Sequence, residues 1–254
     1  MQARASFTLP TGVRLRVDIQ RGVARLLSPL TTFAVVALLR FWLRLSVENH
    51  AELRQAYQRI RGESKAPLLI CANHLTMIDS ALIAWALAGP GWYLLHYDAL
   101  PWNVPERRNF ASTLPRRFLA YVYKCMPIVR GGSREQLAET LARFAHLLVR
   151  GEVGLLFPEG GRSRTGRVDP DNAAYGVGRI VRSIPGCRVL CVYLRGDRQE
   201  SYSVAPARGD RLCVSLAFVE AKSDHPGLRG SRDVARQIVA RLAEMEREYF
   251  DARQ

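Results

Sequence analysis

The chain has 254 residues and a formal net charge of +14, with 48% hydrophobic and 24% charged residues. This length can bury one substantial core, and the composition is ordinary for a globular protein. The charge, carried almost entirely by arginine, favours anionic partners such as lipid head groups, phosphorylated substrates or acidic carrier proteins, although genomic base composition can explain part of it. No clustered basic run accompanies the arginines, so nucleic acid is not an expected partner.

The cysteines and the first 21 residues bear on disulfide formation and on export from the cell. Five cysteines, an odd number without a Cys-x-x-Cys spacing, predict free thiols rather than disulfides or a zinc site. Residues 1–21 contain four arginines and no apolar stretch, so we expect no cleavable signal peptide and predict a polar, irregular arm.

The chain then becomes apolar from Leu26 to Leu45. The uncharged part, Leu26 to Leu39, has 14 residues, fewer than the roughly 20 that a spanning helix requires. Arginines and aromatic residues border it, which is typical of a helix lying in the bilayer interface. We predict such an interfacial helix; a core helix of the soluble domain and a short tilted span are the alternatives.

Beyond residue 47 the pattern alternates between apolar runs and amphipathic stretches. Residues 48–66 are helix-compatible, and Pro67 ends them. We predict strands at 68–72, 92–96, 153–157, 189–194 and 212–219, and helices at 79–87, 133–150 and 231–249. Ser133 and Gln136 form a capping box at the start of the second helix. This interleaving predicts an α/β sheet with helices on both faces. We assign the sheet and its helices to a main domain in residues 63–254, and the arm and interfacial segment to residues 1–62.

Two polar segments directly follow predicted strands. Asn73 and His74 follow the first strand, and Phe157-Pro158-Glu159-Gly160 follows another. Because ligands of open α/β sheets bind beyond the carboxyl ends of the strands, both segments are expected at one edge. Asp79, five residues after His74, can bond to one ring nitrogen and leave the other as a general base. The alternatives are a satisfied core histidine and an aspartate that caps a helix.

Two further segments suit an anion. Glu159 to Arg162 form a turn rich in unhindered N–H groups beside a guanidinium. Lys124 to Gly132 end in glycines and offer two cations, Lys124 and Arg130. Taken singly, each is equally compatible with an ordinary turn or strand end that carries solvated charges.

In this order the three segments resemble the motifs of the lysophospholipid acyltransferase family typified by 1-acylglycerol-3-phosphate acyltransferase. The first motif, Asn-His-x-x-x-x-Asp, is matched by Asn73, His74 and Asp79. The other two are matched by Lys124, Ile128 and Arg130, and by Phe157, Pro158, Glu159, Gly160, Arg162 and Ser163. The resemblance covers about residues 65–200. The chain departs from it at Pro127, where an aromatic usually stands, at Gly161, which replaces threonine, and at Cys191, which replaces a proline in a fourth motif.

The resemblance implies a glycerolipid acyltransferase fold with a mixed, largely parallel sheet flanked by helices. It implies transfer of a fatty acyl group from acyl-CoA or acyl-carrier protein to the hydroxyl of a lysophospholipid, above all 1-acyl-glycerol-3-phosphate, at the cytoplasmic face of the bacterial inner membrane. His74 would be the base and Asp79 its orienting partner, and the bilayer with anionic head groups would be a partner of the protein. The residues implied in binding the acceptor are Lys124, Arg130, Glu159, Gly160 and Arg162. No metal and no cofactor beyond the thioester co-substrate are expected.

The departures from the family motifs leave other functions open. A different acceptor, such as a lyso-ornithine lipid, glycerol-3-phosphate or a pigment-type lipid, would use the same catalytic pair. A basic membrane-binding module without activity is the alternative outside the enzyme class.

Overall fold

The computed structural model describes residues 9–129 and 131–253. Six strands form one sheet in the order β1-β6-β5-β2-β4-β3. Their bounds are β1 Ser46–Val47, β2 Leu68–Ala72, β3 Trp102–Asn103, β4 Val153–Leu156, β5 Arg188–Gly196 and β6 Arg211–Val219. Neighbouring strands are parallel except β5 and β6, which pair antiparallel. The predicted mixed, largely parallel sheet is therefore confirmed.

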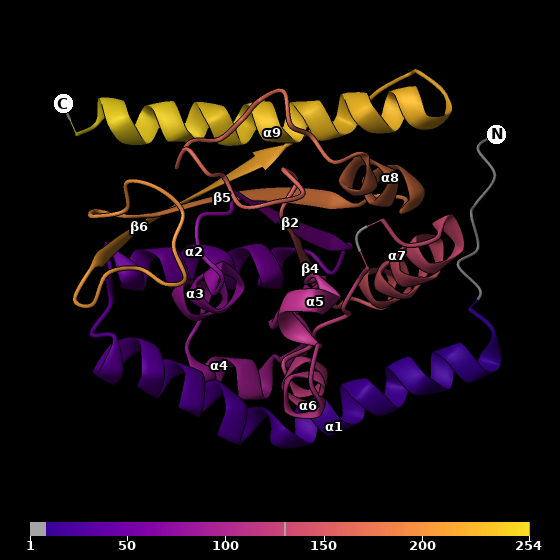
Figure 1. Cartoon of the computed structure of the whole chain (residues 1–254), viewed down its shortest axis with the longest axis horizontal. Coiled ribbons are helices and arrows are strands. Elements are labelled where there is room, and N and C mark those ends of the chain that lie inside the picture. Colours follow the sequence, from indigo (N-terminus) through magenta and orange to yellow (C-terminus); the bar gives the residue numbers. More distant parts are fainter. Residues whose placement is uncertain (1–8, 130, 254) are drawn as a thin grey trace.

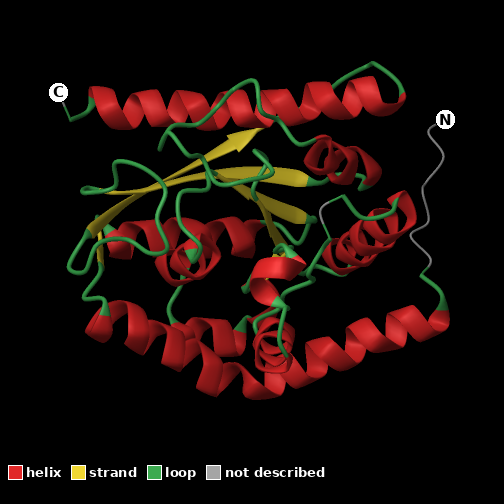
Figure 2. Cartoon of the chain, viewed as in Figure 1, coloured by secondary structure: helices red, strands yellow, loops and turns green. Residues whose placement is uncertain are grey.

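Helices cover both faces of this sheet (Figures 1 and 2). Their bounds are α1 Thr11–Ala37, α2 His50–Glu63, α3 Asp79–Leu87, α4 Pro90–Leu95, α5 Arg107–Phe110, α6 Leu114–Val122, α7 Arg134–Val149, α8 Tyr175–Ser183 and α9 Gly227–Asp251. A π-helical turn, Leu38–Trp42, continues α1, and a short 3-10 turn covers Tyr97–Ala99.

The central strands are apolar along their whole length because both of their faces are buried. On one face they pack against α7, α8 and α9, and on the other against α2 and α3. The predicted stripe on α9 is buried in the first of these clusters, with Val234, Ile238 and Leu242 inaccessible to solvent. Gly178 lets α8 approach α9 closely, because a Cβ there would clash with the carbonyl oxygen of Ser231.

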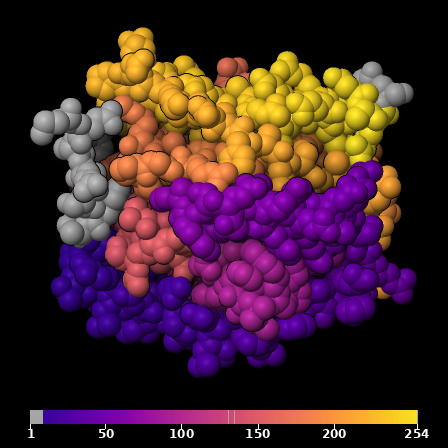
Figure 3. All heavy atoms as spheres, turned by 180° about the vertical axis from the view of Figure 1, so that it is seen from behind, coloured from indigo at the N-terminus to yellow at the C-terminus, as the bar shows by residue number. Residues whose placement is uncertain are grey.

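The prediction of an irregular arm over residues 1–21 is wrong from Thr11 onward, where a helix begins, and residues 1–8 lie outside the described residues. Contacts distant in sequence hold this part of α1 on the domain: Val17 joins the core, Arg21 pairs with Glu152, and the Gln20 amide donates to the carbonyl of Cys125 at 2.9 Å. By length and composition alone, the helix Thr11–Trp42 is able to cross a membrane. In space it lies along one side of the molecule, opposite α9 (Figures 1 and 3).

The strand predicted at 92–96 is also wrong, because Pro90–Leu95 form the helix α4. Proline at the first helical position preorganises the turn, and a run of four or five apolar residues does not distinguish a helix from a strand. The strand at this side of the sheet is β3, whose Trp102 is completely buried. The predicted boundary between residues 1–62 and the main domain stays a prediction. Two elements before it contact the main domain, because β1 pairs with β6 and Tyr57 of α2 lies in the core.

Candidate active site

His74 and Asp79 form a directly hydrogen-bonded pair at the carboxyl end of β2. Nδ1 of His74 lies 2.9 Å from Oδ2 of Asp79. Because a carboxylate accepts, this contact places the proton on Nδ1 and leaves Nε2 as an acceptor. The His74 side chain keeps 17% of its surface exposed, whereas that of Asp79 keeps 1%. The pair can therefore take up a proton at its outer nitrogen while the carboxylate remains shielded from water.

The turn between the two residues holds Asp79 in place. The backbone N–H groups of Leu75 and Thr76 donate to Oδ2 at 2.7 and 2.8 Å, and the Thr76 hydroxyl donates to Oδ1 at 2.6 Å. Asp79 is the first residue of α3, and its side chain bonds back to the preceding turn, not forward to helical N–H groups. The alternative of a simple helix cap is therefore excluded. Thr76 is a positioning residue that the motif alone did not reveal.

The ends of β2 and β4 meet at this edge, as the sequence predicts. These strands are parallel neighbours in register, so the residues after them share one side of the sheet. The rings of His74 and Phe157 are stacked with centroids 3.9 Å apart, and the Ser163 N–H donates to the His74 carbonyl at 2.9 Å. Asn73 exchanges two hydrogen bonds with the backbone of Leu194 in β5, which fixes the strand end that carries His74.

Glu159 lies inside this junction, not beside a cation. It is 4% exposed, and one of its carboxylate oxygens is buried without a hydrogen-bond partner. Burial raises its pKa to about 7, although hydrogen bonds from the backbone N–H groups of Asp169 and His74 oppose the shift. No ion pair within the described ranges joins Glu159 to an arginine, so the carboxylate belongs to the junction with the His74 segment and does not position a cation.

Lys124 is not available to a substrate. It is completely buried, and its ammonium donates to the carbonyls of Tyr97 and Leu100 and to Oε2 of Glu152 at 3.0, 2.6 and 2.6 Å. These three acceptors occupy all of its donors. Burial also lowers the pKa of Lys124 to about 8, against the opposing effect of Glu152. The predicted acceptor contact is therefore wrong for Lys124, whose role is structural.

The remaining predicted acceptor residues are placed as follows. Gly160 has a φ of +68°, which a glycine adopts without strain, and it shapes the turn beside His74. Arg162 is half-buried, with its guanidinium 5.5 Å from the centre of the Tyr202 ring. Arg130 lies outside the described residues.

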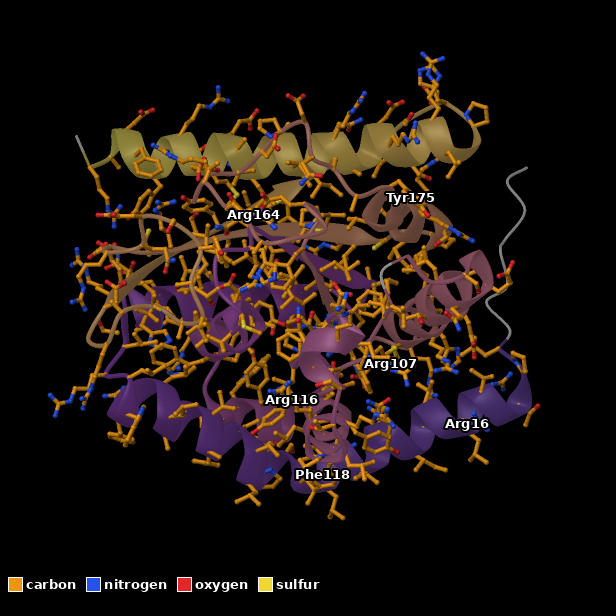
Figure 4. All side chains as sticks on the ribbon, viewed as in Figure 1. Arg16, Arg107, Arg116, Phe118, Arg164 and Tyr175 are labelled. Carbon is orange, nitrogen blue, oxygen red and sulfur yellow. The ribbon has the colours of Figure 1, made fainter. Side chains whose placement is uncertain are left out.

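The loop between β5 and β6 also reaches the site, which the sequence did not indicate. Ser203 donates its N–H to the Leu75 carbonyl at 3.0 Å, and Met77 donates to the Val204 carbonyl at 3.2 Å. This loop brings Tyr202 against Arg162. Arg164, exposed in the loop after β4 (Figure 4), is a further cation of this region, whereas Arg167 lies over the Phe250 ring at 3.6 Å. A loop without a motif carries no sequence signal of this kind.

The cysteines are free thiols, as predicted. Burial raises the pKa of Cys71, on the strand before His74, well above its ordinary value, so a thiolate nucleophile is not expected there. Among the described residues, no group of three or more His, Cys, Asp or Glu side chains is arranged to hold a metal ion.

The fold and the site define an α/β protein with a histidine–aspartate pair and a glycine–arginine loop at the carboxyl edge of its sheet. Comparison with protein families gives the class a name: the model of the family described as Acyltransferase matches residues 44–195, more than half of the chain. The chain belongs to this acyltransferase family. Among curated proteins, no match was found.

Proposed function

We propose that this acyltransferase moves a fatty acyl group from acyl-CoA or acyl-carrier protein to the free hydroxyl of a lysophospholipid, with 1-acyl-glycerol-3-phosphate as acceptor and phosphatidic acid as product. The observation that carries the proposal is the His74–Asp79 pair, oriented by four hydrogen bonds to the carboxylate and lying beside the Gly160–Arg162 loop.

The pair supports direct transfer without an acyl-enzyme. Nε2 of His74 takes the proton from the acceptor hydroxyl as its oxygen attacks the thioester carbonyl. The C–O bond forms, the C–S bond breaks, and the imidazolium returns its proton to the leaving thiolate. Asp79 stabilises the positive charge that forms on the ring, because its carboxylate accepts from Nδ1 at 2.9 Å.

The acceptor phosphate is assigned to the loop after β4. Arg162 offers a guanidinium that meets a phosphate with two parallel hydrogen bonds, and Gly160 leaves the backbone accessible. Arg130 remains part of this assignment on the strength of its motif. Lys124 does not, because its donors are all engaged in the core.

The enzyme is assigned to the membrane interface, at the cytoplasmic face of a bacterial inner membrane, through α1. Six exposed apolar side chains of α1 and the π-helical turn that continues it recur at intervals of three, four, seven or eight and share one outward face. They are Leu15, Ile19, Leu26, Leu30, Phe33 and Phe41, each at least half exposed. The opposite face is buried on the domain at Val17, Ala24, Ser28 and Leu39. A helix anchored along its whole length in this way lies flat, so it favours an interfacial position over a span.

The test is transfer by the purified full chain, with radiolabelled acyl-CoA or acyl-carrier protein and a panel of acceptors. We expect phosphatidic acid from 1-acyl-glycerol-3-phosphate, and a loss of about 10²–10⁴-fold in the His74→Ala variant with an unchanged melting curve. His225→Ala is the matched control, because His225 is exposed just before α9 and faces Asp233 instead of Asp79. Near-normal turnover by His74→Ala would overturn the catalytic assignment. Labelling of glycerol-3-phosphate, lyso-ornithine lipid or a pigment-type lipid alone would replace the acceptor but keep the chemistry.

A further inference from the structure

A cleft of about 310 Å³ lies between α1, α6 and α7. Its lining residues do not include His74, Asp79 or any residue of the glycine loop. Part of its wall is apolar and comes from Val17, Ala120 and Met126. The cleft is therefore a separate feature of the surface, on the side of the molecule that α1 covers.

Three arginines from three helices converge on this cleft: Arg16 of α1, Arg117 of α6 and Arg143 of α7. No aspartate or glutamate is among the residues that line it. Within residues 9–129 and 131–253, the side chain of Arg16 forms no hydrogen bond or ion pair. The side chain of Arg117 uses only Nε, which donates to the carbonyl of Ala111 at 3.1 Å. Arg143 pairs with Glu139 through one terminal nitrogen, while its Nε is buried without a partner. Arg16 and Arg117 thus have no carboxylate partner among the described residues, and guanidinium groups in a concave wall concentrate a positive potential.

Exposed apolar side chains border the cleft on both sides. Leu15 and Ile19 flank Arg16 along α1, with 59% and 50% of their surfaces exposed. On α6, Leu114 and Phe118 lie one turn apart and are 78% and 57% exposed. Figure 4 labels Arg16, Arg116 and Phe118 on this side of the molecule. A basic cleft with apolar borders complements an amphiphile that has an anionic head and apolar chains.

We propose that the cleft between α1, α6 and α7 binds the phosphate head group of an anionic membrane phospholipid, with α6 entering the interface beside α1. Arginine forks recognise phosphate oxygens, and the exposed side chains of α1 and α6 meet the acyl chains. A free phosphate would use the arginines alone and would leave Leu114 and Phe118 in water. The inference rests on the membrane placement in the proposed function, and it adds a second anchoring helix and a head-group site to it.

The test is flotation of the full chain with phosphatidylcholine vesicles, with or without phosphatidylglycerol. Arg117→Gln/Arg143→Gln should weaken binding to the anionic vesicles by roughly 20- to 30-fold, since each arginine near an anionic surface contributes about a factor of five. The charge-matched control is Arg232→Gln/Arg236→Gln on α9, exposed on the opposite side of the molecule (Figure 1), and should change binding by less than about twofold because screening removes distant charges. Equal losses in both double variants would overturn the head-group site in favour of a general charge effect.

A second pair of variants leaves every arginine in place. Thr140 lines the cleft on α7, and Thr140→Glu adds a carboxylate there, while Thr140→Gln adds the same bulk without charge. Only the glutamate variant should lose affinity for anionic vesicles, by about fivefold or more, with melting curves unchanged in both. Inorganic phosphate is the probe for a free-phosphate site. If the wild type binds it saturably, the Arg117→Gln/Arg143→Gln variant does not, and both bind vesicles equally well, the cleft is a free-phosphate site and the proposal is overturned. Acyl transfer to a short-chain, water-soluble acceptor is measured in parallel, so failure of the cleft and failure of the His74 chemistry are separate results.

Discussion

At the residue scale, the environment of Asp79 predicts how strongly the catalytic base depends on it. The buried carboxylate accepts from Nδ1 of His74, from two backbone N–H groups and from the Thr76 hydroxyl. Asp79→Asn removes the charge that stabilises the imidazolium and exchanges one acceptor oxygen for a donor. We expect turnover to fall by about 10²–10⁴-fold with the fold retained. Steady-state acyl transfer measures the effect, Asp171→Asn in an exposed turn is the control, and a decrease of less than tenfold would contradict the orienting role.

Glu159 makes a prediction about stability and pH. Its pKa of about 7 in the folded protein lies above the ordinary value of 4.5 because the carboxylate is buried. Between pH 4.5 and pH 7 this carboxyl therefore holds more proton in the folded chain than in the unfolded chain, and its contribution to the free energy of unfolding decreases as the pH rises through this window. Glu159→Gln stays neutral and lacks this slope. The difference in unfolding free energy, wild type minus variant, should fall by about 2–3 kcal/mol from pH 5 to pH 8 in urea titrations. Parallel pH profiles for the two proteins would show that Glu159 does not titrate in this range, and exposed Glu139→Gln serves as the control.

At the scale of secondary-structure elements, Glu152 connects the start of β4 to the rest of the domain. It accepts from Lys124, from Nε1 of Trp102 in β3 and from Arg21 of α1. Lys124→Met removes the ammonium that pairs with this buried carboxylate, so we expect the free energy of unfolding to decrease by about 3 kcal/mol. The KM for the phosphorylated acceptor should change by less than about twofold. Exposed Lys222→Met is the control, and a raised KM with unchanged stability would restore Lys124 to the acceptor site.

The sequence predicts elements well where local signals agree and poorly where distant contacts decide. α3 has the predicted bounds, and Ser133 caps α7 by accepting from the Gln136 N–H at 3.2 Å. The first turns of α1 were not predicted, because Arg21 and Val17 gain their partners only after folding. Lys124 shows the same limit at the site, because a motif identifies a residue but not its surroundings. In the folded chain its ammonium meets Glu152, just before β4, and the Trp102 ring of β3. The His74–Asp79 pair was predictable because both partners lie on one turn.

At the scale of the whole molecule, the two sides of the sheet are covered differently. α9 buries its apolar stripe against the strands and turns a charged face outward, with Arg241 bonded to Glu244 and Glu248. α1 does the reverse over most of its length, because its buried face is narrow and its large apolar side chains point away from the domain. Exposed apolar side chains aligned along about 26 residues of one helix, roughly 40 Å at 1.5 Å per residue, form a surface that water does not favour. Under the proposed membrane placement, this asymmetry assigns the α1 side of the molecule to the bilayer.

This asymmetry predicts the effect of changing the outward stripe alone. Deleting residues 1–47 is not a clean test, because it also removes Val17, Leu39 and Leu45 from the core and β1 from the sheet. Leu30 is 72% exposed in the middle of the stripe, and Leu228, 60% exposed, lies on α9 at the opposite side. Leu30→Gln should weaken vesicle binding by about tenfold or more, the amount expected when one leucine side chain no longer enters an apolar phase. Leu228→Gln should leave binding within twofold, and both variants should melt like the wild type. If the two variants bind vesicles with equal affinity, α1 does not meet the bilayer through this face. A protease added to the cytoplasmic side of sealed inverted membranes tests for a span: if it cannot reach residues 9–25, the helix crosses the membrane.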